Sequence, residues 1–205
     1  MIQWAGAEPQ ENQAFIVCLG FFDGVHLGHQ QLLKAASKIK DQTGDRVCVH
    51  TYDVPPVSII APNKQYAELT PLQEKIPLLL SFGADTVAIS HFDEKLMKMT
   101  GAEFLDQVLF KEMRVRHLIT GFDHRFGFHA DTGAKELEEL CKQRKIMLTV
   151  VPPVKTDDGH TISSTAIREK IISGQLQGVK EMLGREPDSD MINRLQKITI
   201  NGGGR

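Results

Sequence analysis

Two histidines three positions apart lie in a glycine-rich segment, Gly20–His29, which reads GFFDGVHLGH. If a helix begins there, His26 and His29 share one face of its first turn. Imidazoles that face a bound triphosphate can donate hydrogen bonds to the oxygens that gain charge during phosphoryl transfer. Gly20 and Gly24 permit a tight turn and a close approach of the backbone to a ligand. The segment therefore predicts a phosphate-binding site. The alternatives are incidental helix histidines or a metal site, for which no third ligand stands at a recognisable spacing.

Hydroxyl groups gather in a second segment, Ile162–Arg168, which reads ISSTAIR. Ser163, Ser164 and Thr165 stand at an expected helix start, where hydroxyls can cap the helix and bind phosphate oxygens. Arg168 follows Ser164 by four positions, so a cation lies on the same helix face. The pattern predicts a clamp on phosphates. The alternative is a helix cap followed by a solvated arginine that contributes little to stability.

A third segment, Gly121–Gly127 (GFDHRFG), combines an acidic residue with aromatic side chains. Asp123 could hold magnesium or a hydrated phosphate. Phe126 could stack on a ring. The alternative is a turn aspartate followed by a phenylalanine that packs in the core.

The elements that must position these residues follow from the spacing of apolar residues, which switches repeatedly between strand-like and helix-like and indicates an α/β fold. Strands are expected over Ala14–Phe21, Arg46–Tyr52, Asp85–Ser90, Val115–Thr120 and Ile146–Val151. Helices are expected over Leu27–Lys40, Thr70–Ser81, Thr100–Leu109, Ala134–Arg144, Ser164–Ser173 and Leu176–Leu183. This alternation predicts a Rossmann-like, parallel five-stranded sheet flanked by helices. The first and third segments each follow a strand, at the edge where such sheets bind ligands.

Proline and glycine mark two further expectations. Thr70 is the expected N-cap of its helix, with Pro71 at the first helical position, and Pro77 should shorten or bend that helix. The last segment, Asp188–Arg205, changes character and ends in a run of glycines, so we expect an appended element or a frayed terminus.

Composition excludes several classes of function. The chain has 205 residues, of which 41% are hydrophobic and 24% are charged, as in an ordinary globular protein. A formal net charge of −2 provides no electrostatic footprint for nucleic acid or an anionic membrane. The three cysteines are odd in number and widely spaced, which favours a reducing, cytoplasmic location over a disulfide framework. The first residues do not read as a signal peptide, and no apolar stretch approaches the ~20 residues that span a bilayer.

All three segments resemble motifs of one family. GFFDGVHLGH resembles the G-x-F-D-G-x-H-x-G-H motif in the FAD synthetase domain of bacterial bifunctional riboflavin kinase/FAD synthetases, members of the H-x-G-H nucleotidylyltransferase superfamily. ISSTAIR resembles the I-S-S-T-x-I-R motif that closes over the ATP triphosphate, and GFDHRFG resembles the G-x-D-F-x-F-G loop of the flavin and nucleotide sites. Leu176–Arg185 resembles the end of the synthetase domain, so the resemblance spans Phe15 to Arg185.

The resemblance implies an FMN adenylyltransferase that converts ATP and FMN to FAD and diphosphate by in-line, Mg²⁺-assisted transfer without a covalent intermediate. It implies catalytic roles for His26, His29 and Arg168. The implied ATP-binding residues are Gly20, Phe21, Phe22, Asp23, Gly24, His26, Gly28, His29, Ser163, Ser164, Thr165 and Arg168. The implied flavin-binding residues are Pro55, Pro56, Asp123, Arg125 and Phe126, with Asp123 also the expected magnesium ligand.

The chain departs from the family pattern at four places, one of which is Phe128–Gly133, a residue longer than usual and without the common basic residue. Val54-Pro55-Pro56 stands where the family usually has Pro-His-Pro, His124 replaces a phenylalanine, and Ala166 replaces a common arginine. Two other functions therefore stay open: transfer of a nucleotide to another phosphorylated acceptor, and non-catalytic binding of a flavin or nucleotide. We expect residues 1–187 to form the nucleotidylyltransferase domain and residues 188–205 a short tail, with no riboflavin kinase domain present.

Overall fold

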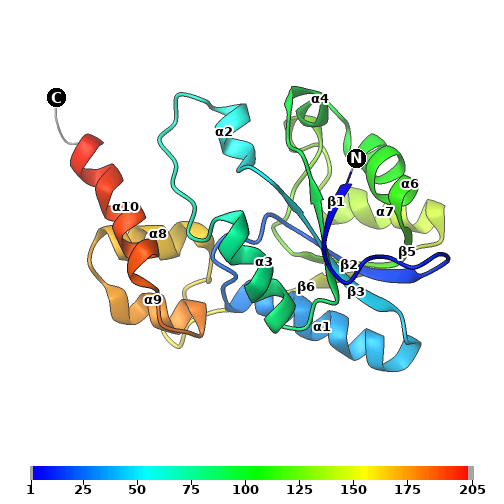
Figure 1. The fold of residues 1–205 in the computed structure, drawn as a ribbon, viewed down its shortest axis with the longest axis horizontal. Helices are drawn as coiled ribbons and strands as arrows, with labels where there is room; N and C mark the ends of the chain where they lie inside the picture. Colours follow the sequence, from blue (N-terminus) through cyan, green and yellow to red (C-terminus); the bar gives the residue numbers. More distant parts are fainter. Residues whose placement is uncertain (1, 203–205) are drawn as a thin grey trace.

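In the computed structural model, which describes residues 2–202 and the side chains of residues 2–197, a six-stranded sheet forms the centre of the molecule (Figure 1). Its strand order is β1-β4-β3-β2-β5-β6. Five of the strands run parallel, as the sequence predicted: β2 (Ala14–Leu19), β3 (Arg46–Tyr52), β4 (Thr86–Ser90), β5 (Arg114–Gly121) and β6 (Met147–Val151). The α/β class is therefore confirmed.

The predicted count of five strands is wrong, because β1 (Ile2–Gly6) adds an antiparallel edge strand beside β4. Its register pairs Ile2 with Ser90 and Gly6 with Thr86. Of its residues only Ile2 is buried, so this edge strand lacks the apolar run that marked the central strands in the sequence.

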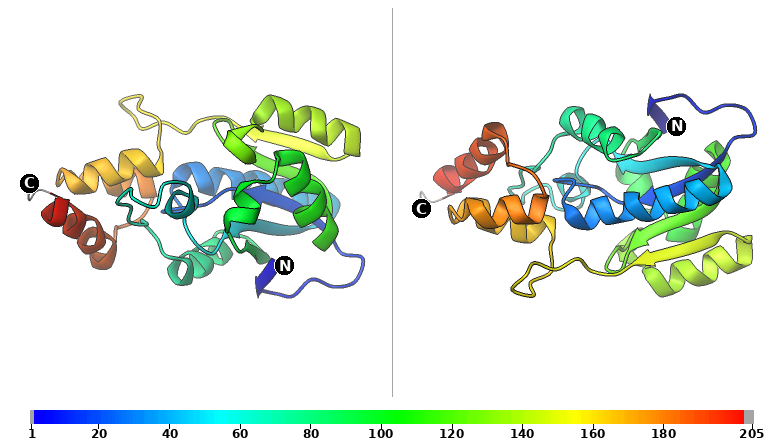
Figure 2. Two further views of the ribbon diagram at one scale, coloured as in Figure 1. Left: turned by 90° about the horizontal axis from the view of Figure 1, so that it is seen from above. Right: turned by 90° about the horizontal axis from the view of Figure 1, so that it is seen from below.

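Helices cover both faces of the sheet (Figure 2). Side chains of β2 alternate between the two faces: Phe15, Val17 and Leu19 join one apolar cluster, and Ile16 and Cys18 join the other. The first cluster also receives α5 (Gly101–Phe104), the π-helix η1 (Leu105–Leu109) and α7 (Ala134–Arg144); the second receives α1 (Leu27–Thr43) and α3 (Leu72–Ser81). Shorter elements are α2 (Pro56–Ile60), α4 (Glu94–Met97), α6 (Phe110–Glu112) and the 3₁₀ turn η2 (Phe128–Ala130).

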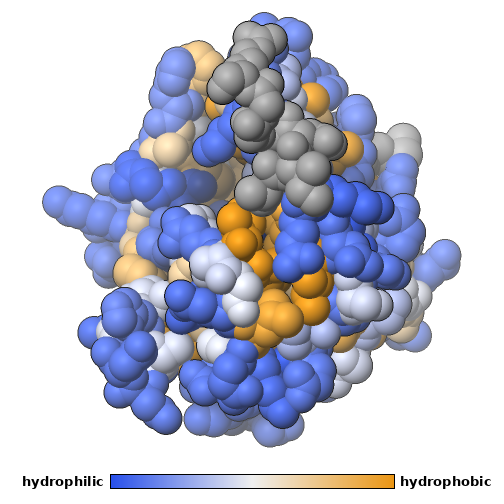
Figure 3. Space-filling view, turned by 90° about the vertical axis from the view of Figure 1, so that its left-hand side faces the viewer, coloured by the Kyte–Doolittle hydropathy of each residue, from blue (hydrophilic) through white to orange (hydrophobic). Residues whose placement is uncertain are grey.

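A third apolar cluster lies at one end of the molecule, where α8 (Ser164–Ile172), α9 (Leu176–Leu183) and α10 (Ser189–Gly202) gather beside the sheet (Figure 1). Figure 3 views this end and shows an apolar area among hydrophilic residues, and the end carries two exposed apolar side chains, Ile172 and Leu176. None of the helices formed by residues 2–202 has both the length and the apolar surface that a membrane crossing requires.

The segment after residue 187 contains α10, which packs on α8 through the buried side chains of Met191 and Leu195. The Asp188 carboxylate accepts the backbone N–H of Met191 at 2.6 Å, as an N-cap does. Arg194 donates two hydrogen bonds to the Glu74 carboxylate and one to the carbonyl of Leu69, all at 2.9 Å. Residues 203–205 lie outside the described residues, and the division of the chain at residue 187 stays a prediction.

The start of α3 differs from the prediction. The helix begins at Leu72 with Pro71 in the N-cap position, and no side chain caps it. Thr70 is therefore not the N-cap. Its backbone N–H donates instead to the carboxylate of Asp23, in the segment Gly20–His29, at 3.0 Å. Pro77 lies inside the helix and does not end it. A tertiary contact thus decides where this helix begins.

The buried His50 on β3 makes the stability of the fold depend on pH. Its Nε2 lies 2.8 Å from the Ser90 hydroxyl, and its ring meets the edges of Tyr52 and Phe104. Burial lowers the pKa of His50 to about 3 from the usual 6.5, and the neighbouring His124 acts in the same direction. Between these values the unfolded chain binds the extra proton, so His50 makes the protein less stable as pH falls below 6.5.

We expect His50→Gln to reduce this pH dependence. Between pH 7 and pH 5, the variant should lose about 2 kcal/mol less unfolding free energy than the parent protein, from ~1.4 kcal/mol per pKa unit. Urea unfolding at the two pH values measures the difference. Equal losses in both proteins would show that His50 does not titrate between its folded and unfolded states.

Candidate active site

The first motif forms the loop between β2 and α1 and the first turn of α1. His26 is the N-cap of α1, and its Nδ1 accepts the backbone N–H of His29 at 3.4 Å. The two imidazoles stack with 3.7 Å between ring centroids, and Phe22 lies 5.0 Å from the His29 ring. The predicted shared face of His26 and His29 is therefore present in the structure.

Both imidazoles are neutral at pH 7 in the ligand-free protein. Burial, followed by the charge of Arg185, lowers the pKa of His26 to about 4. Burial, and then His26, Lys75 and His124, hold the pKa of His29 well below 6.5. Nδ1 of His29 is buried without a hydrogen-bond partner among the described residues. A bound polyphosphate would favour the charged forms, so the pair can become donors when phosphate arrives.

The backbone of this loop is strained. Phe22 and Val25 adopt positive φ angles of 57° and 40°, a region that residues other than glycine seldom occupy and a β-branched one least of all. The carbonyl of Val25 accepts hydrogen bonds from Gln30 Nε2 at 3.0 Å and from Arg185 Nη1 at 3.3 Å. Arg185 also donates to the carbonyl of Gly24 at 2.9 Å. The segment after α9 thus fixes the loop conformation.

The loop conformation requires a residue without a side chain at Gly24. Its φ is +83°, and a Cβ there would come within 2.7 Å of a methyl group of Leu69. Gly24 consequently packs below the loop, away from the cavity that the other motif residues line.

Asp23 is almost completely buried and joins the loop to three other segments. Its carboxylate accepts hydrogen bonds from the Tyr66 hydroxyl at 2.9 Å, the backbone N–H of Thr70 at 3.0 Å, and Nη2 of Arg168. Arg168 also donates through Nε to the carbonyl of Ala67 at 3.1 Å. Both carboxylate oxygens of Asp23 therefore have protein partners in the ligand-free protein.

Arg168 is not the solvated helix arginine that one reading of the sequence allowed. Its side chain is 17% exposed, and its guanidinium lies over the ring of Tyr66, 4.4 Å from the centroid. Tyr66 is a residue that sequence analysis missed, because a single tyrosine in a loop carries no recognisable spacing. The Asp23–Tyr66–Arg168 group holds the guanidinium at the cavity wall.

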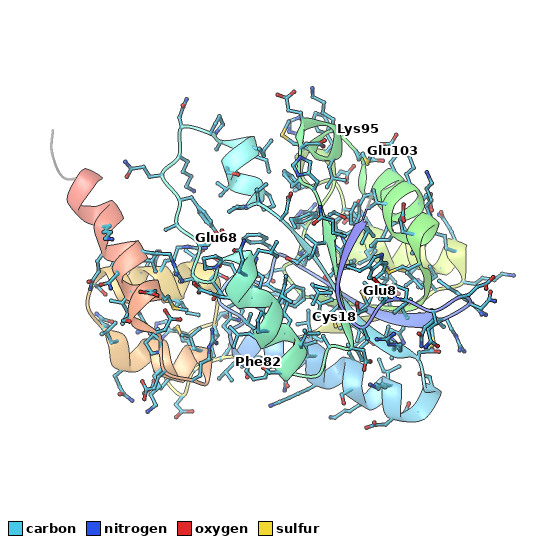
Figure 4. All side chains as sticks on the ribbon, in the orientation of Figure 1. Glu8, Cys18, Glu68, Phe82, Lys95 and Glu103 are labelled. Atoms are coloured by element: carbon cyan, nitrogen blue, oxygen red, sulfur yellow. The ribbon has the colours of Figure 1, made fainter. Side chains whose placement is uncertain are left out.

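A buried lysine supports the same loop from α3. Lys75 donates to the carbonyl of Phe21 at 3.0 Å and lies 3.7 Å from the centroid of the Phe21 ring. Burial lowers the pKa of Lys75, and Asp23 and Glu68 oppose that shift. Glu68, labelled in Figure 4 beside α3, lies 3.8 Å from the ammonium group.

The second motif opens α8 against the first. Ser163 is the N-cap and accepts the backbone N–H of Ala166 at 3.2 Å. The Ser164 hydroxyl donates to the backbone carbonyl of Asp23 at 2.8 Å, so the two motifs are in direct contact. Thr165 is exposed at the helix start, where free backbone N–H groups and the helix dipole favour phosphate.

A polar cavity of about 500 Å³ lies between these motifs at the carboxyl edge of the sheet. Every residue predicted to bind ATP lines it except Gly24. His124, which replaces the family's phenylalanine, also lines it, as do residues that the sequence did not single out: Tyr66, Phe122, Pro152, Pro153 and Val154. The cavity is large enough for a nucleotide.

A second cavity, of about 570 Å³, adjoins the first. Three of its lining residues, Phe21, His124 and Arg125, also line the polar cavity. The rest are mainly aromatic, methionine and other apolar side chains: Tyr52, Pro56, Ile60, Phe92, Leu96, Met97, Met99, Phe104, Phe126 and Phe128. A flat aromatic ligand fits this lining.

The residues predicted to bind flavin divide between the two cavities. Pro56, Arg125 and Phe126 line the apolar cavity, and Asp123 lines the polar one. Pro55 lines neither; it is the N-cap of α2. Sequence analysis missed the apolar lining residues on α4, on α5 and in the loop after β4. The same apolar residue types pack in a protein core and bind an aromatic ring, so the sequence does not distinguish the two roles.

The described residues contain no group of three histidine, cysteine, aspartate or glutamate side chains arranged to hold a metal ion. Asp123 is exposed in the polar cavity. A single carboxylate together with substrate phosphates is a common way for proteins to hold Mg²⁺. Asp123 therefore fits a magnesium ion that arrives with a nucleotide.

A mainly parallel sheet with a phosphate-type loop at its carboxyl edge and a neighbouring hydroxyl-rich helix start is typical of the nucleotide-binding class of α/β proteins. The FAD synthetase family matches residues 8–166. The chain belongs to this family.

Relatives extend this assignment. The chain is 34% identical over 171 residues to the bifunctional riboflavin kinase/FMN adenylyltransferase of Listeria monocytogenes serovar 1/2a, covering 82% of this chain and 53% of that protein. It is 31% identical over 179 residues to the FAD synthetase of the same organism, covering 87% and 72%. A crystal structure described as a macrolide-efflux protein from Streptococcus pneumoniae superposes with a TM-score of 0.75 at 26% identity, covering 86% and 57%. The chain spans about half the length of the bifunctional relatives that it matches.

We predict that Arg168→Ala destabilises the protein by about 3 kcal/mol, because it leaves the buried Asp23 carboxylate without its cation. Urea unfolding measures this loss. The double variant Asp23→Asn/Arg168→Ala is the control: removal of the carboxylate charge should recover part of the stability. An unchanged unfolding midpoint in Arg168→Ala would place the guanidinium in solvent.

Proposed function

We propose that the protein is an FMN adenylyltransferase that converts ATP and FMN to FAD and diphosphate. The observation that carries the proposal is the pair of adjoining cavities. The polar one lies on two phosphate-type motifs, and the apolar one is lined by aromatic side chains. A product in which a nucleotide is joined to a flavin would occupy both. The family and its relatives' names support this choice of acceptor.

In the proposed reaction, an oxygen of the flavin phosphate attacks the α-phosphorus of ATP in line, a new phosphorus–oxygen bond forms, and the bond to the leaving diphosphate breaks. The nucleophile is already anionic at neutral pH, so no general base is required. We assign His26 and His29 to the transferring phosphate and Ser164, Thr165 and Arg168 to the β- and γ-phosphates. Positioning and charge neutralisation then account for catalysis.

Asp123, which lines the polar cavity, would hold a magnesium ion that enters with ATP. When bound, Mg²⁺ neutralises charge on the phosphate oxygens. Asp23 acts through Arg168 and Tyr66 in this proposal, because its oxygens are occupied by protein donors. We also propose a cytoplasmic location, which the three buried free thiols support.

Purified protein supplied with ATP, Mg²⁺ and FMN should form FAD and release diphosphate, measured by chromatography and a coupled diphosphate assay. Diphosphate release with another phosphorylated acceptor but not with FMN would show that the acceptor is wrong. Flavin binding without diphosphate release would show that the protein binds flavin without catalysis, and it would refute the proposed enzyme activity.

His29→Ala should lower turnover by about 10²–10³, the usual cost of removing one donor that stabilises developing charge. The control is His160→Ala, since His160 is exposed and lines neither cavity. Steady-state rates of FAD formation, with circular dichroism to verify folding, provide the comparison. Equal rates in the two variants would show that His29 does not contact the transferring phosphate.

A further inference from the structure

The junction of the two cavities is the place where the proposed reaction must occur. A bond between a nucleotide in one cavity and a flavin in the other forms where the cavities meet. Only Phe21, His124 and Arg125, among the described residues, line both. Donors for the acceptor phosphate are therefore to be sought among these three.

Two of the three already make hydrogen bonds within the protein. The Phe21 side chain is apolar, and its carbonyl already accepts hydrogen bonds from Thr51 Oγ1 at 2.9 Å and Lys75 Nζ at 3.0 Å. Arg125 donates through Nε at 3.0 Å and Nη2 at 2.8 Å to the carbonyl of Ala130, which fixes the loop before α7. The Arg125 guanidinium keeps N–H groups outside these two bonds, so Arg125 and His124 are the two side chains among these three that can donate at the junction.

His124 differs from both. Within the described part of the chain, no side-chain hydrogen bond involves its ring, which is partly exposed where the two cavities meet. The ring is nonetheless fixed, because it stacks on Phe126 with 5.6 Å between centroids and an interplanar angle of 23°. Phe126 is in turn held edge-on against Phe104, 5.6 Å away. A rigid imidazole thus faces the junction.

The electrostatics of the junction suit an incoming anion. Burial lowers the pKa of His124 to about 4, and only Asp123 opposes the shift. His124 is close enough to His29 and His50 to help lower the pKa of each. An N–H of the His124 ring can donate a hydrogen bond to a phosphate at the junction of the two cavities.

We propose, on the basis of the adenylyl transfer proposed above, that His124 donates a hydrogen bond to the phosphate of the flavin acceptor and thereby selects phosphorylated over unphosphorylated flavin. In this proposal His124 contacts the acceptor phosphate, and the His26–His29 pair contacts the nucleotide. The acceptor phosphate would then lie between two sets of imidazoles, with its attacking oxygen directed at the α-phosphorus.

Two substitutions separate hydrogen bonding from packing. His124→Phe restores the residue of the family motif, keeps a ring against Phe126 and removes both nitrogens. His124→Gln keeps a donor of similar reach and removes the ring. The readouts are the dissociation constants of FMN and riboflavin from flavin fluorescence, with ATP and Mg²⁺ present, and the KM values for FMN and ATP.

We expect His124→Phe to weaken FMN binding and raise KM for FMN about ten-fold or more, as loss of a charge-assisted hydrogen bond does. Riboflavin binding and KM for ATP should change less than about two-fold, since neither involves the acceptor phosphate. His124→Gln should retain most of the preference for FMN over riboflavin.

The inference is overturned if His124→Phe keeps the wild-type preference for FMN while wild-type protein makes FAD. It is also overturned if FMN and riboflavin binding weaken equally, because His124 then only packs against the ring system. Wild-type protein that binds no FMN would refute the proposed function itself, and this inference with it.

Discussion

The buried carboxylate of Asp23 is the constraint on which the site depends. It ties four segments together: the first motif, the loop at Tyr66, Thr70 just before α3, and Arg168 on α8. These segments are separated by up to 145 positions in the chain. A buried charge is costly unless it is paired and hydrogen-bonded, so each of these contacts reduces the cost of burying Asp23. The cavity is the space that this arrangement leaves between the motifs.

The charge balance of the cavity follows from the same burial. Burial lowers the pKa of both His26 and His29, and the nearby charges of Arg185 and Lys75 act in the same direction. In the ligand-free site the imidazoles of His26 and His29 are therefore neutral hydrogen-bond donors. A bound phosphate would supply the compensating negative charge, and this would link ligand binding to the electrostatic support of the proposed reaction.

The sequence predicted the parts of the structure that depend on local spacing. The central strands and the helices Ala134–Arg144 and Leu176–Leu183 were predicted, because apolar periodicity and glycine stops mark them. Both phosphate-type motifs were found because their residues are adjacent in the chain. Most of the residues predicted to bind ATP do line one cavity.

What the sequence could not predict depends on long-range contacts. Tyr66 and Arg185 enter the site from segments without a motif, and the solvated reading of Arg168 failed because its partner lies at Asp23. The edge strand β1 owes its existence to pairing with β4, which no periodicity in Ile2–Gly6 reveals. The apolar cavity escaped for a similar reason, since its lining comes from several separate elements.

The hydrogen bonds from Arg185 to Gly24 and Val25 have a consequence for the order of events during synthesis. On the ribosome, the loop after β2 emerges about 160 residues before the side chain that holds its strained backbone. The Arg168 contact at Asp23 is equally delayed. Residues 8–166, the part that defines the family, include neither arginine. A nascent chain can therefore assemble the sheet early, but its phosphate loop reaches its final shape only after α9 has left the exit tunnel. The loop between β2 and α1 is consequently one of the last parts of the fold that the growing chain completes.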